Sequence, residues 1–296
     1  MRSAILLFVM FVSVAAGFAQ DGFPMGKVIE GFEKFRQSLP FVNQIVLTED
    51  FFARKAELEG TKAAFLAFMT DDAVVFTPER TNARQFWTAR QPKAGTLLSW
   101  APNFADVSSN GALGYTTGNW EFRSNAKDVE AAGYGDFITL WSRQPDGSYK
   151  WIIDIGVEHA KPAKYSTEWT SAKVVGGAKP QDSDLTQAFF QMVEAKGLAK
   201  AYNKFADDNI RGYREGKLPL LGKKALLNVV KDDKGVVTLV KRGTVFRADD
   251  LAYMLTGYQK KTGNKIEKGN YLQIWKFSSG KNGKWHIVLE IFKPAE

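Results

Sequence analysis

The chain has 296 residues, of which 45% are hydrophobic and 24% charged, and it contains no cysteine. This composition excludes a disordered chain and a disulfide-stapled one. The formal net charge is +8. It lies in the second half, since residues 182–296 hold 21 Lys and Arg against 13 Asp and Glu, whereas residues 20–181 hold 18 against 19. A basic half of this kind either attracts anionic ligands and surfaces or presents a solvated, lysine-rich face.

The N-terminus is typical of a secretory signal peptide. Arg2 precedes an apolar run from Ala4 to Ala16, which is too short to span a bilayer, and small residues follow up to Ala19. We expect cleavage after Ala19 and a periplasmic or secreted mature protein. No nucleic-acid-binding signature and no later transmembrane pattern occurs in the sequence, so we expect neither a nucleic-acid partner nor a membrane span.

The sequence repeats itself with an offset of about 135 residues, and a repeat at a fixed offset indicates tandem structural units. The stretch KAAFLAFMTDDAVVF (Lys62–Phe76) is matched by LAKAYNKFADDNIRGY (Leu198–Tyr213), each with an acidic pair after an apolar helical pattern. Two tryptophans lie ten residues apart near the end of each copy, Trp141 and Trp151 in one, Trp275 and Trp285 in the other. Aligning the tryptophans places Val288 at the position of Asp154, so any acid at this place in the second copy must be Glu290, two residues later.

Hydrophobic periods predict the same elements in both copies, helices first and then strands joined by polar turns. In the first copy we expect a helix from Glu49 to Met69 that breaks near Gly60, a short strand Ala73–Phe76, a helix Ala83–Arg90, and strands Leu97–Val107, Gly114–Arg123, Asp136–Arg143 and Lys150–Val157. In the second copy we expect helices Leu185–Phe205 and Lys223–Val230, and strands Val236–Arg247, Leu251–Tyr258, Asn270–Phe277 and Trp285–Phe292.

This order predicts two tandem α+β domains, each with helices packed on a mostly antiparallel sheet. We expect a signal peptide over residues 1–19, an N-terminal arm or helix over 20–43, a first domain over 44–157, a linker over 158–183 and a second domain over 184–296. The linker is indicated by its prolines, its glycine pair and its small polar residues.

The first copy resembles the SnoaL-like domains of the nuclear transport factor 2-like superfamily, which includes ketosteroid isomerase. The resemblance rests on AAFLAFMTDDAVVFTP, SWAPNFADV, LGYTTGNWEF and GDFITLWSRQPDGSYKWIIDIG. The second copy matches mainly in order and spacing. The resemblance implies a cone in each domain, with helices closing over a strongly curved sheet, and an apolar cavity suited to small molecules. Members include enzymes and non-catalytic modules, so the fold does not decide the function.

Asp154 is the first candidate for a functional group, because it interrupts the apolar strand WIIDIG. Strand alternation predicts that it faces away from Trp151, Ile153 and Ile155. If it faces a cavity, burial raises its pKa and allows proton transfer. The resemblance suggests a hydroxyl partner such as Tyr115, because ketosteroid isomerase combines an aspartate base with tyrosine and protonated aspartate donors. Otherwise Asp154 is paired with an arginine or faces solvent.

Aromatic residues recur along the predicted strands, and Trp100, Trp120 and Trp141 are the candidates for lining a ligand cavity. The simpler alternative for each is a place in the core. The acidic pairs Asp71–Asp72 and Asp207–Asp208 are interpreted as helix stops that bond local backbone. Because the chain has two histidines and no cysteine, we expect no metal site. It contains no nucleotide-binding motif, so we expect no cofactor.

Three functions remain open from the sequence. The first is an exported protein that binds a small apolar ligand in the cone of its first domain, with the basic second domain as packing partner or as a contact for anionic surfaces. The second is a cofactor-independent isomerase, dehydratase or hydrolase that uses Asp154. The third is a structural module with filled cones, in which the paired domains mimic a dimer.

Overall fold

The computed structural model of the chain describes residues 25–165, 168–172, 185–233, 235–240, 243–278 and 283–295. The predicted signal peptide lies outside these ranges, as do residues 173–183 of the predicted linker. The first half contains α2 (Met25–Ser38), α3 (Phe41–Glu59), α4 (Thr61–Phe68), β1 (Met69–Phe76), β2 (Arg80–Asn82), α5 (Ala83–Ala89), β3 (Leu97–Val107), β4 (Leu113–Arg123), β5 (Gly133–Arg143), β6 (Tyr149–Glu158) and β7 (Thr170–Ser171).

The second half contains α6 (Leu185–Lys196), α7 (Leu198–Phe205), β8 (Ala206–Arg214), β9 (Leu220–Leu221), α8 (Lys223–Asp232), β10 (Val236–Leu239), β11 (Thr244–Ala248), β12 (Leu251–Thr262), β13 (Lys265–Ser278) and β14 (Lys284–Pro294). The expected α+β class is confirmed. Within the described residues, no helix is both long and apolar enough to cross a membrane.

Each half forms one seven-stranded sheet. The first has the order β2-β1-β6-β5-β4-β3-β7, and the second has the order β10-β12-β13-β14-β8-β9 with β11 also on β12. Neighbouring strands are antiparallel except β1 with β6, β8 with β14 and the short β7 with β3. The β7 pair lies in the segment predicted as linker.

Glycines break the first helical run of each half, as the pattern in the first copy predicts. Gly60 separates α3 from α4 at a φ of +92°, and Gly197 separates α6 from α7 at a φ of +79°. Both angles lie in the left-handed region that favours glycine. The break lets each pair of helices wrap over one face of its sheet.

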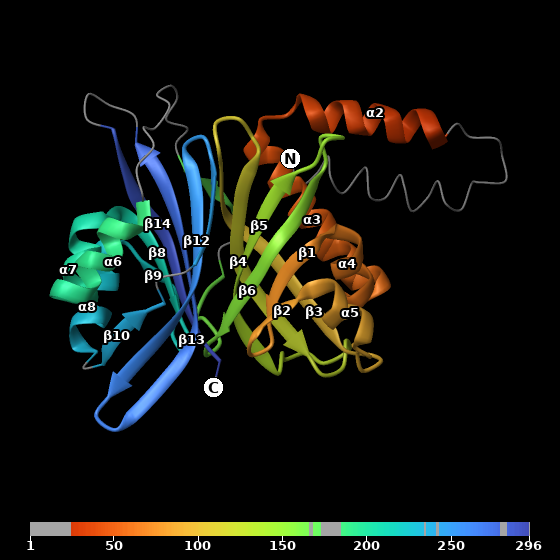
Figure 1. The fold of residues 1–296 in the computed structure, drawn as a ribbon. Coiled ribbons are helices and arrows are strands. Elements are labelled where there is room, and N and C mark those ends of the chain that lie inside the picture. The colour runs from red at the N-terminus through yellow and green to blue at the C-terminus, as the bar shows by residue number, and fades with distance from the viewer. Residues whose placement is uncertain are drawn as a thin grey trace.

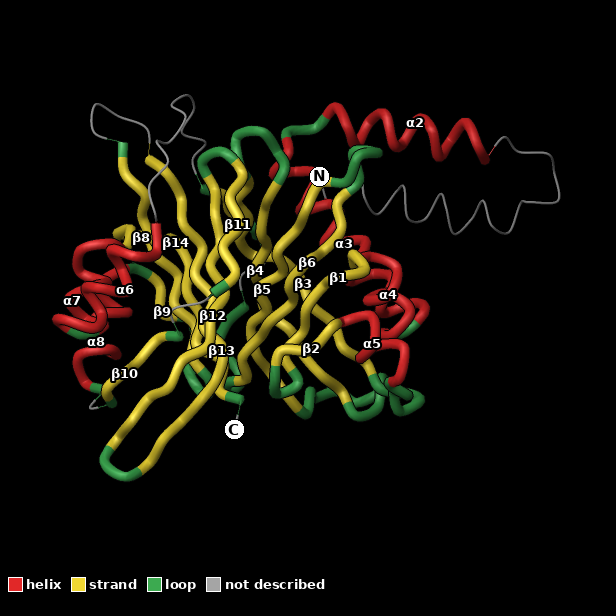
Figure 2. The backbone as a smooth tube through the Cα atoms, viewed as in Figure 1, coloured by secondary structure: helices red, strands yellow, loops and turns green. Residues whose placement is uncertain are grey.

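The two sheets pack face to face with their helices outside, so the chain has the layers helix, sheet, sheet, helix (Figure 1). The strands form the centre of the molecule and the helices its two flanks (Figure 2). One apolar cluster joins the facing surfaces. Its fully buried members come from both sheets and include Leu113, Ile138, Leu140, Ile153 and Ile155 of the first and Leu255, Leu272, Ile274, Leu289 and Ile291 of the second.

Polar contacts fix the register of the two sheets around this apolar centre. The hydroxyls of Thr117 and Tyr213 lie 2.8 Å apart across the interface. Lys276 lies 3.2 Å from a carboxylate oxygen of Asp106 and 3.2 Å from one of Asp250, and it donates to the carbonyl of Val107 at 2.8 Å. Asp106 and Val107 belong to the first domain, whereas Lys276 and Asp250 belong to the second.

A β-bulge in the last long strand of each sheet interrupts the alternation of its side chains. In β5 and β6 the pairing passes from Leu140 opposite Ile153 to Trp141 opposite Trp151, so Ile152 is an extra residue. Trp151 therefore belongs to the core under the helices, whereas Ile153 belongs to the cluster between the sheets. The prediction that Trp151 and Ile153 share a face is wrong, because a bulge shifts alternation by one residue.

The same bulge corrects the alignment of the two halves. In β13 and β14 the pairing passes from Ile274 opposite Leu289 to Trp275 opposite Ile287, with Val288 as the extra residue. Val288 is therefore the counterpart of Ile152, not of Asp154. The residue in the register position of Asp154 is Glu290, because eleven residues separate Trp275 from its partner Ile287, whereas nine separate Trp141 from its partner Trp151.

The acidic pairs do not end their helices. Helix α4 ends at Phe68 and α7 at Phe205, and both aspartate pairs lie in the following strands β1 and β8, with Asp71 and Asp72 exposed. Asp71 pairs with the guanidinium of Arg84 at 2.8 Å. The local backbone bond that was predicted exists in the second half, where Asp207 accepts from the amide of Asn209 at 2.8 Å.

The predicted strand Val236–Arg247 is two strands in the structure. Leu239 pairs with Tyr258 and Thr244 pairs with Leu255, so the register on β12 shifts between the two segments and the ladder is interrupted. At the equivalent place in the first domain, Pro102 pairs with Gly118 and Phe104 with Thr117, so Asn103 alone is an extra residue and β3 remains one strand.

Replacing Lys276 with Met tests the contribution of its contacts with Asp106, Asp250 and Val107 to stability. The change leaves the buried carboxylates of Asp106 and Asp250 facing each other without a cation, and breaking a buried pair in this way typically costs about 3–5 kcal/mol. We expect urea denaturation to give a free energy of unfolding lower by that order. The control is Lys284→Met, which removes an exposed lysine of β14. A loss no larger than that of the control contradicts the role given to Lys276.

Candidate functional site

The first domain contains a cavity of about 470 Å³ between its helices and the concave face of its sheet. This is within the range of volumes that hold small ligands. The lining comes from α3, α4, the four long strands and the loop before β5: Phe52, Phe65, Leu98, Trp100, Trp120, Phe122, Ala132, Gly133, Phe137, Asp154, Gly156 and Glu158. Seven of these twelve residues are aromatic or leucine, and the only charged ones are Asp154 and Glu158.

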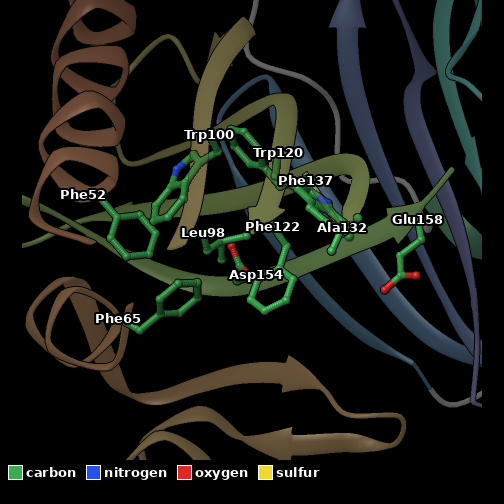
Figure 3. A pocket seen from close by; sticks show the side chains of 12 residues that line it. Phe52, Phe65, Leu98, Trp100, Trp120, Phe122, Ala132, Phe137, Asp154 and Glu158 are labelled. Atoms are coloured by element: carbon green, nitrogen blue, oxygen red, sulfur yellow. The ribbon is translucent and has the colours of Figure 1, made fainter. Parts of the chain in front are cut away.

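Asp154 points into this cavity, since the bulge at Ile152 turns it to the concave face. Its carboxylate lies among the apolar side chains near Leu98 and Phe122, whereas Glu158 lies apart at the far end of the lining (Figure 3). Thr139 on the neighbouring strand donates to Asp154 Oδ2 at 2.9 Å. Burial raises the pKa of Asp154 to about 6, and the bond from Thr139 only partly offsets this effect.

Glycines make room for the indole of Trp120. Trp120 on β4 lies opposite Gly135 on β5, and a Cβ at Gly135 would come within 2.4 Å of the indole. Gly156 on β6 is the next neighbour, and a Cβ there would lie 2.8 Å from a backbone carbonyl. A larger residue at either position cannot fit without movement of the backbone or of Trp120. The cavity therefore depends on these glycines as well as on the aromatic residues.

Glu49 is a second buried acid next to the cavity, and the sequence analysis missed it. It is fully buried on α3 and accepts bonds from the indole of Trp100 and from the hydroxyl of Thr116, both at 2.6 Å. Burial raises its pKa to about 8, and the charge of Asp154 adds to the rise while the two donors oppose it. Because Trp100 lines the cavity, Glu49 lies one hydrogen bond behind the cavity wall.

A signal for Glu49 exists in the sequence. Ile45, Glu49, Phe52 and Ala56 are spaced four, three and four residues apart, which places them on one helix face. A carboxylate within an apolar helix face is costly to bury and is held there by hydrogen bonds. The same argument that singled out Asp154 on its strand applies to Glu49 on its helix.

Two of the candidate residues lie elsewhere. Tyr115 is fully buried in the cluster between the sheets, with its ring 6.0 Å from that of Phe104, so it does not meet Asp154. Trp141 is fully buried beneath the cavity and donates to Thr116 Oγ1 at 2.8 Å. Among the candidates named from the sequence, Asp154, Trp100 and Trp120 line the cavity.

In the second domain the corresponding interior is occupied by a polar network. Glu290 is fully buried and accepts bonds from the guanidinium of Arg214 and from Tyr202, the latter at 2.8 Å. The hydroxyls of Tyr202 and Tyr271 lie 2.7 Å apart, and the amide of Gln273 donates to Tyr271. Every buried group here has a partner within the chain, which stabilises a closed core.

Side-chain volume explains the difference between the domains. Phe292 occupies the register position of Gly156, and its ring packs 4.1 Å from that of Tyr271 and 4.6 Å from that of Tyr258. A second cavity of about 580 Å³ lies in this domain with Arg214, Tyr258 and Phe292 in its lining, which mixes apolar residues with nine charged ones. The apolar, nearly uncharged cavity is that of the first domain.

Among the described residues no group of three or more His, Asp or Glu side chains is placed to hold a metal ion. His159 is instead paired in the interior, with its Nε2 2.7 Å from Asp136 Oδ2 and its Nδ1 2.8 Å from the carbonyl of Ala160. Burial raises the pKa of Asp136 to about 6 even though His159 opposes the rise. This pair lies on the face of β5 that meets the second domain.

No family profile and no curated protein sequence matches the chain. Among solved structures, the chain is similar to NTF2-like proteins of unknown function. One from Pseudomonas putida KT2440 has 17% identity, covers 37% of this chain and 80% of its own, and has a TM-score of 0.32. One from Shewanella oneidensis MR-1 has 12% identity over 36% and 92%, with a TM-score of 0.30.

A third, described as an NTF2-like protein of unknown function in nutrient uptake from Rhodospirillum rubrum, has 14% identity over 38% of this chain and 98% of its own, with a TM-score of 0.32. Each match covers little more than a third of the chain. These similarities concern the fold alone.

Replacing Glu49 with Gln tests whether this buried acid is protonated in the folded protein. The folded pKa values of Glu49 and Asp154, about 8 and about 6, exceed the ordinary values of 4.5 and 3.8. The folded chain therefore binds more protons than the unfolded chain between about pH 4 and 8, so its stability falls as the pH rises through that window.

We expect Glu49→Gln to flatten the fall between about pH 6 and 8, because each unit of pKa shift corresponds to about 1.4 kcal/mol. Chemical denaturation across this range measures the slope. Glu79→Gln, an exposed substitution, serves as the control and should leave the slope unchanged. An equal slope in wild type and Glu49→Gln means that Glu49 is ionised in the folded protein.

Proposed function

We propose that the first domain binds a small, largely apolar molecule in its cone and holds one polar group of that molecule at Asp154. We also propose that the protein is exported, as the N-terminal signal-peptide pattern predicts. The second domain, whose interior is closed by the Glu290 network, acts in it as the structural partner that covers the outer face of the first sheet.

The observation that carries this proposal is an apolar cavity of about 470 Å³ with a carboxylate inside it. A purely structural domain gains stability by filling such a space, because an unfilled apolar cavity is destabilising. The second domain has Phe292 where the first has Gly156, so the fold tolerates a filled cone. The open cone of the first domain argues for an occupant.

The charges of the lining limit the ligand chemistry. The described residues that line the cavity include no lysine, arginine or histidine. With a pKa of about 6, Asp154 is mostly ionised at neutral pH. A neutral ligand that offers a hydrogen-bond donor, or a cationic one, therefore fits, whereas an anionic ligand is repelled. The aromatic walls favour flat or cyclic apolar groups.

Acid/base catalysis without a cofactor is the second candidate, and one observation favours it. Two neighbouring acids have pKa values that differ by about two units, so at neutral pH Glu49 retains its proton while Asp154 has mostly lost its own. Such separated pairs supply an acid and a base in other enzymes. Conversion of a bound compound by the wild type, abolished in Asp154→Asn while binding persists, separates catalysis from binding.

Two fluorescent probes test the binding proposal. N-phenyl-1-naphthylamine is apolar and carries one N–H donor, and 1-anilinonaphthalene-8-sulfonate has the same rings with an added anion. We expect the first probe to bind the wild type and the second to bind at least about tenfold more weakly, because Asp154 repels the sulfonate. Fluorescence titration of the purified protein measures both.

A cavity-filling variant identifies the site. A Cβ at Gly133 meets the indole of Trp120 at 3.6 Å and the Cβ of Phe122 at 3.9 Å, both ordinary contact distances, so Gly133→Phe places a ring in the cavity without a backbone clash. We expect it to abolish binding of N-phenyl-1-naphthylamine. Val129→Phe adds the same ring at a residue that is 90% exposed and should leave binding intact. Binding that survives Gly133→Phe rules out this cavity.

Asp154→Asn and acid pH should remove the discrimination between the probes. Below about pH 6 the carboxyl group is neutral, so we expect the sulfonate probe to gain affinity as the pH falls through that value. In Asp154→Asn the same probe should bind without this pH dependence. If wild type and variant respond to pH alike, Asp154 does not govern the choice of ligand.

A further inference from the structure

The hairpin of β12 and β13 extends past the edge of the first domain (Figure 1). The two strands stay paired without a shift from Leu251 opposite Lys276 to Thr262 opposite Lys265. Strand β10 joins the outer part of the hairpin, with Val236 opposite Lys261. The inner part of this three-stranded ribbon packs on the first domain, and the outer part has no such cover.

Alternation assigns the side chains of the outer part to faces. Tyr253 and Leu255 on β12 and Leu272 on β13 belong to the cluster between the sheets. Counting outward by two residues from these places one set of side chains on the same face, because the register is continuous. This hairpin face consists of Val236, Thr238, Gln259, Lys261, Ile266 and Lys268.

The hairpin face is apolar at its centre and open to solvent. Val236 is 70% exposed and Ile266 is 56% exposed, and Lys261 lies between them in the same cross-strand row. Aliphatic side chains this exposed on a projecting ribbon are typical of a contact surface. Farther inward on the same face, equivalent positions are fully buried against the first domain, so the face loses its cover only where the hairpin projects.

The charge of the hairpin tip is positive. Lys261, Lys265 and Lys268 are exposed, and none of them forms an ion pair within the part of the chain that the structure describes. Lys260 is different, because it lies on the other face and pairs with Asp233 at 2.8 Å. The acid of the tip, Glu267, also lies on that other face and accepts from the hydroxyl of Tyr258 at 2.7 Å.

We propose that the hairpin face binds an anionic phospholipid surface, with Ile266 and Val236 entering the interfacial layer and Lys261 and Lys268 contacting the headgroups. Lys265 lies on the other face at the end of the hairpin and adds to the positive charge there. Protein interfaces are enriched in aromatic residues and arginine and depleted in lysine, and this face has the opposite composition. Lysine suits a lipid surface, since its aliphatic stem lies along apolar groups while its ammonium stays in water. Each lysine near an anionic membrane contributes about 1 kcal/mol of binding.

Vesicle co-sedimentation of the mature protein tests this proposal. We expect binding to vesicles of phosphatidylcholine mixed with phosphatidylglycerol and none to phosphatidylcholine alone. Reversing the charges in Lys261→Glu/Lys265→Glu/Lys268→Glu should weaken binding by more than about a hundredfold, given the contribution of each lysine. The matched control reverses three exposed lysines elsewhere, Lys93→Glu/Lys127→Glu/Lys224→Glu, and should lose much less.

The apolar part needs its own variant, because charge alone also attracts soluble polyanions. Ile266→Ser/Val236→Ser should weaken binding to the mixed vesicles and leave binding to dextran sulfate unchanged. Circular dichroism of each variant confirms that the fold is retained. The proposal is overturned by an absence of binding to the mixed vesicles, by equal losses in the two triple variants, or by full vesicle binding of Ile266→Ser/Val236→Ser.

Discussion

Each sheet of this protein has apolar side chains on both faces, and such a sheet is stable only when both are covered. Helices cover one face of each sheet, and the two remaining faces cover each other through the cluster that contains Ile138, Ile153, Leu272 and Ile291. The relative position of the two domains follows from this requirement, with Lys276 bound between carboxylates of both. The hairpin of β12 and β13 is the exception, because the second sheet is longer than the first there and part of its face is left to solvent.

The bulge in the last long strand of each sheet decides what enters the cones. One extra residue, Ile152 or Val288, keeps the apolar side chains on the interface and turns an acid inward. In the first domain that acid is Asp154, facing an aromatic cavity that persists because glycine occupies positions 135 and 156. In the second domain it is Glu290, bound by Arg214 and Tyr202 in an interior closed by Phe292. The two halves thus share a backbone plan and differ in the volume of a few side chains.

The sequence predicted the tandem α+β architecture and most element bounds, because these depend on local periodicity and on a repeated pattern. It named Asp154 as a candidate but left open which way its side chain points. The bulges were not predicted, since one extra residue in a strand leaves no mark on composition, and so the face of Trp151 and the counterpart of Asp154 were assigned wrongly. Tyr115 was assigned to the cavity because a single strand pattern cannot distinguish an inner face from an interface between domains. Glu49 could have been found from the apolar helix face on which it lies.

The central claim is that the apolar cavity of the first domain is a binding site, whereas the network around Glu290 fills the corresponding place in the second domain. A crystal structure of the mature protein soaked with N-phenyl-1-naphthylamine tests it most directly. The account predicts density for one probe molecule between Trp100 and Trp120, with its N–H directed at Asp154, and an undisturbed network around Glu290. A probe bound inside the second domain in place of that network, or a first cone closed by its own side chains, would contradict the account.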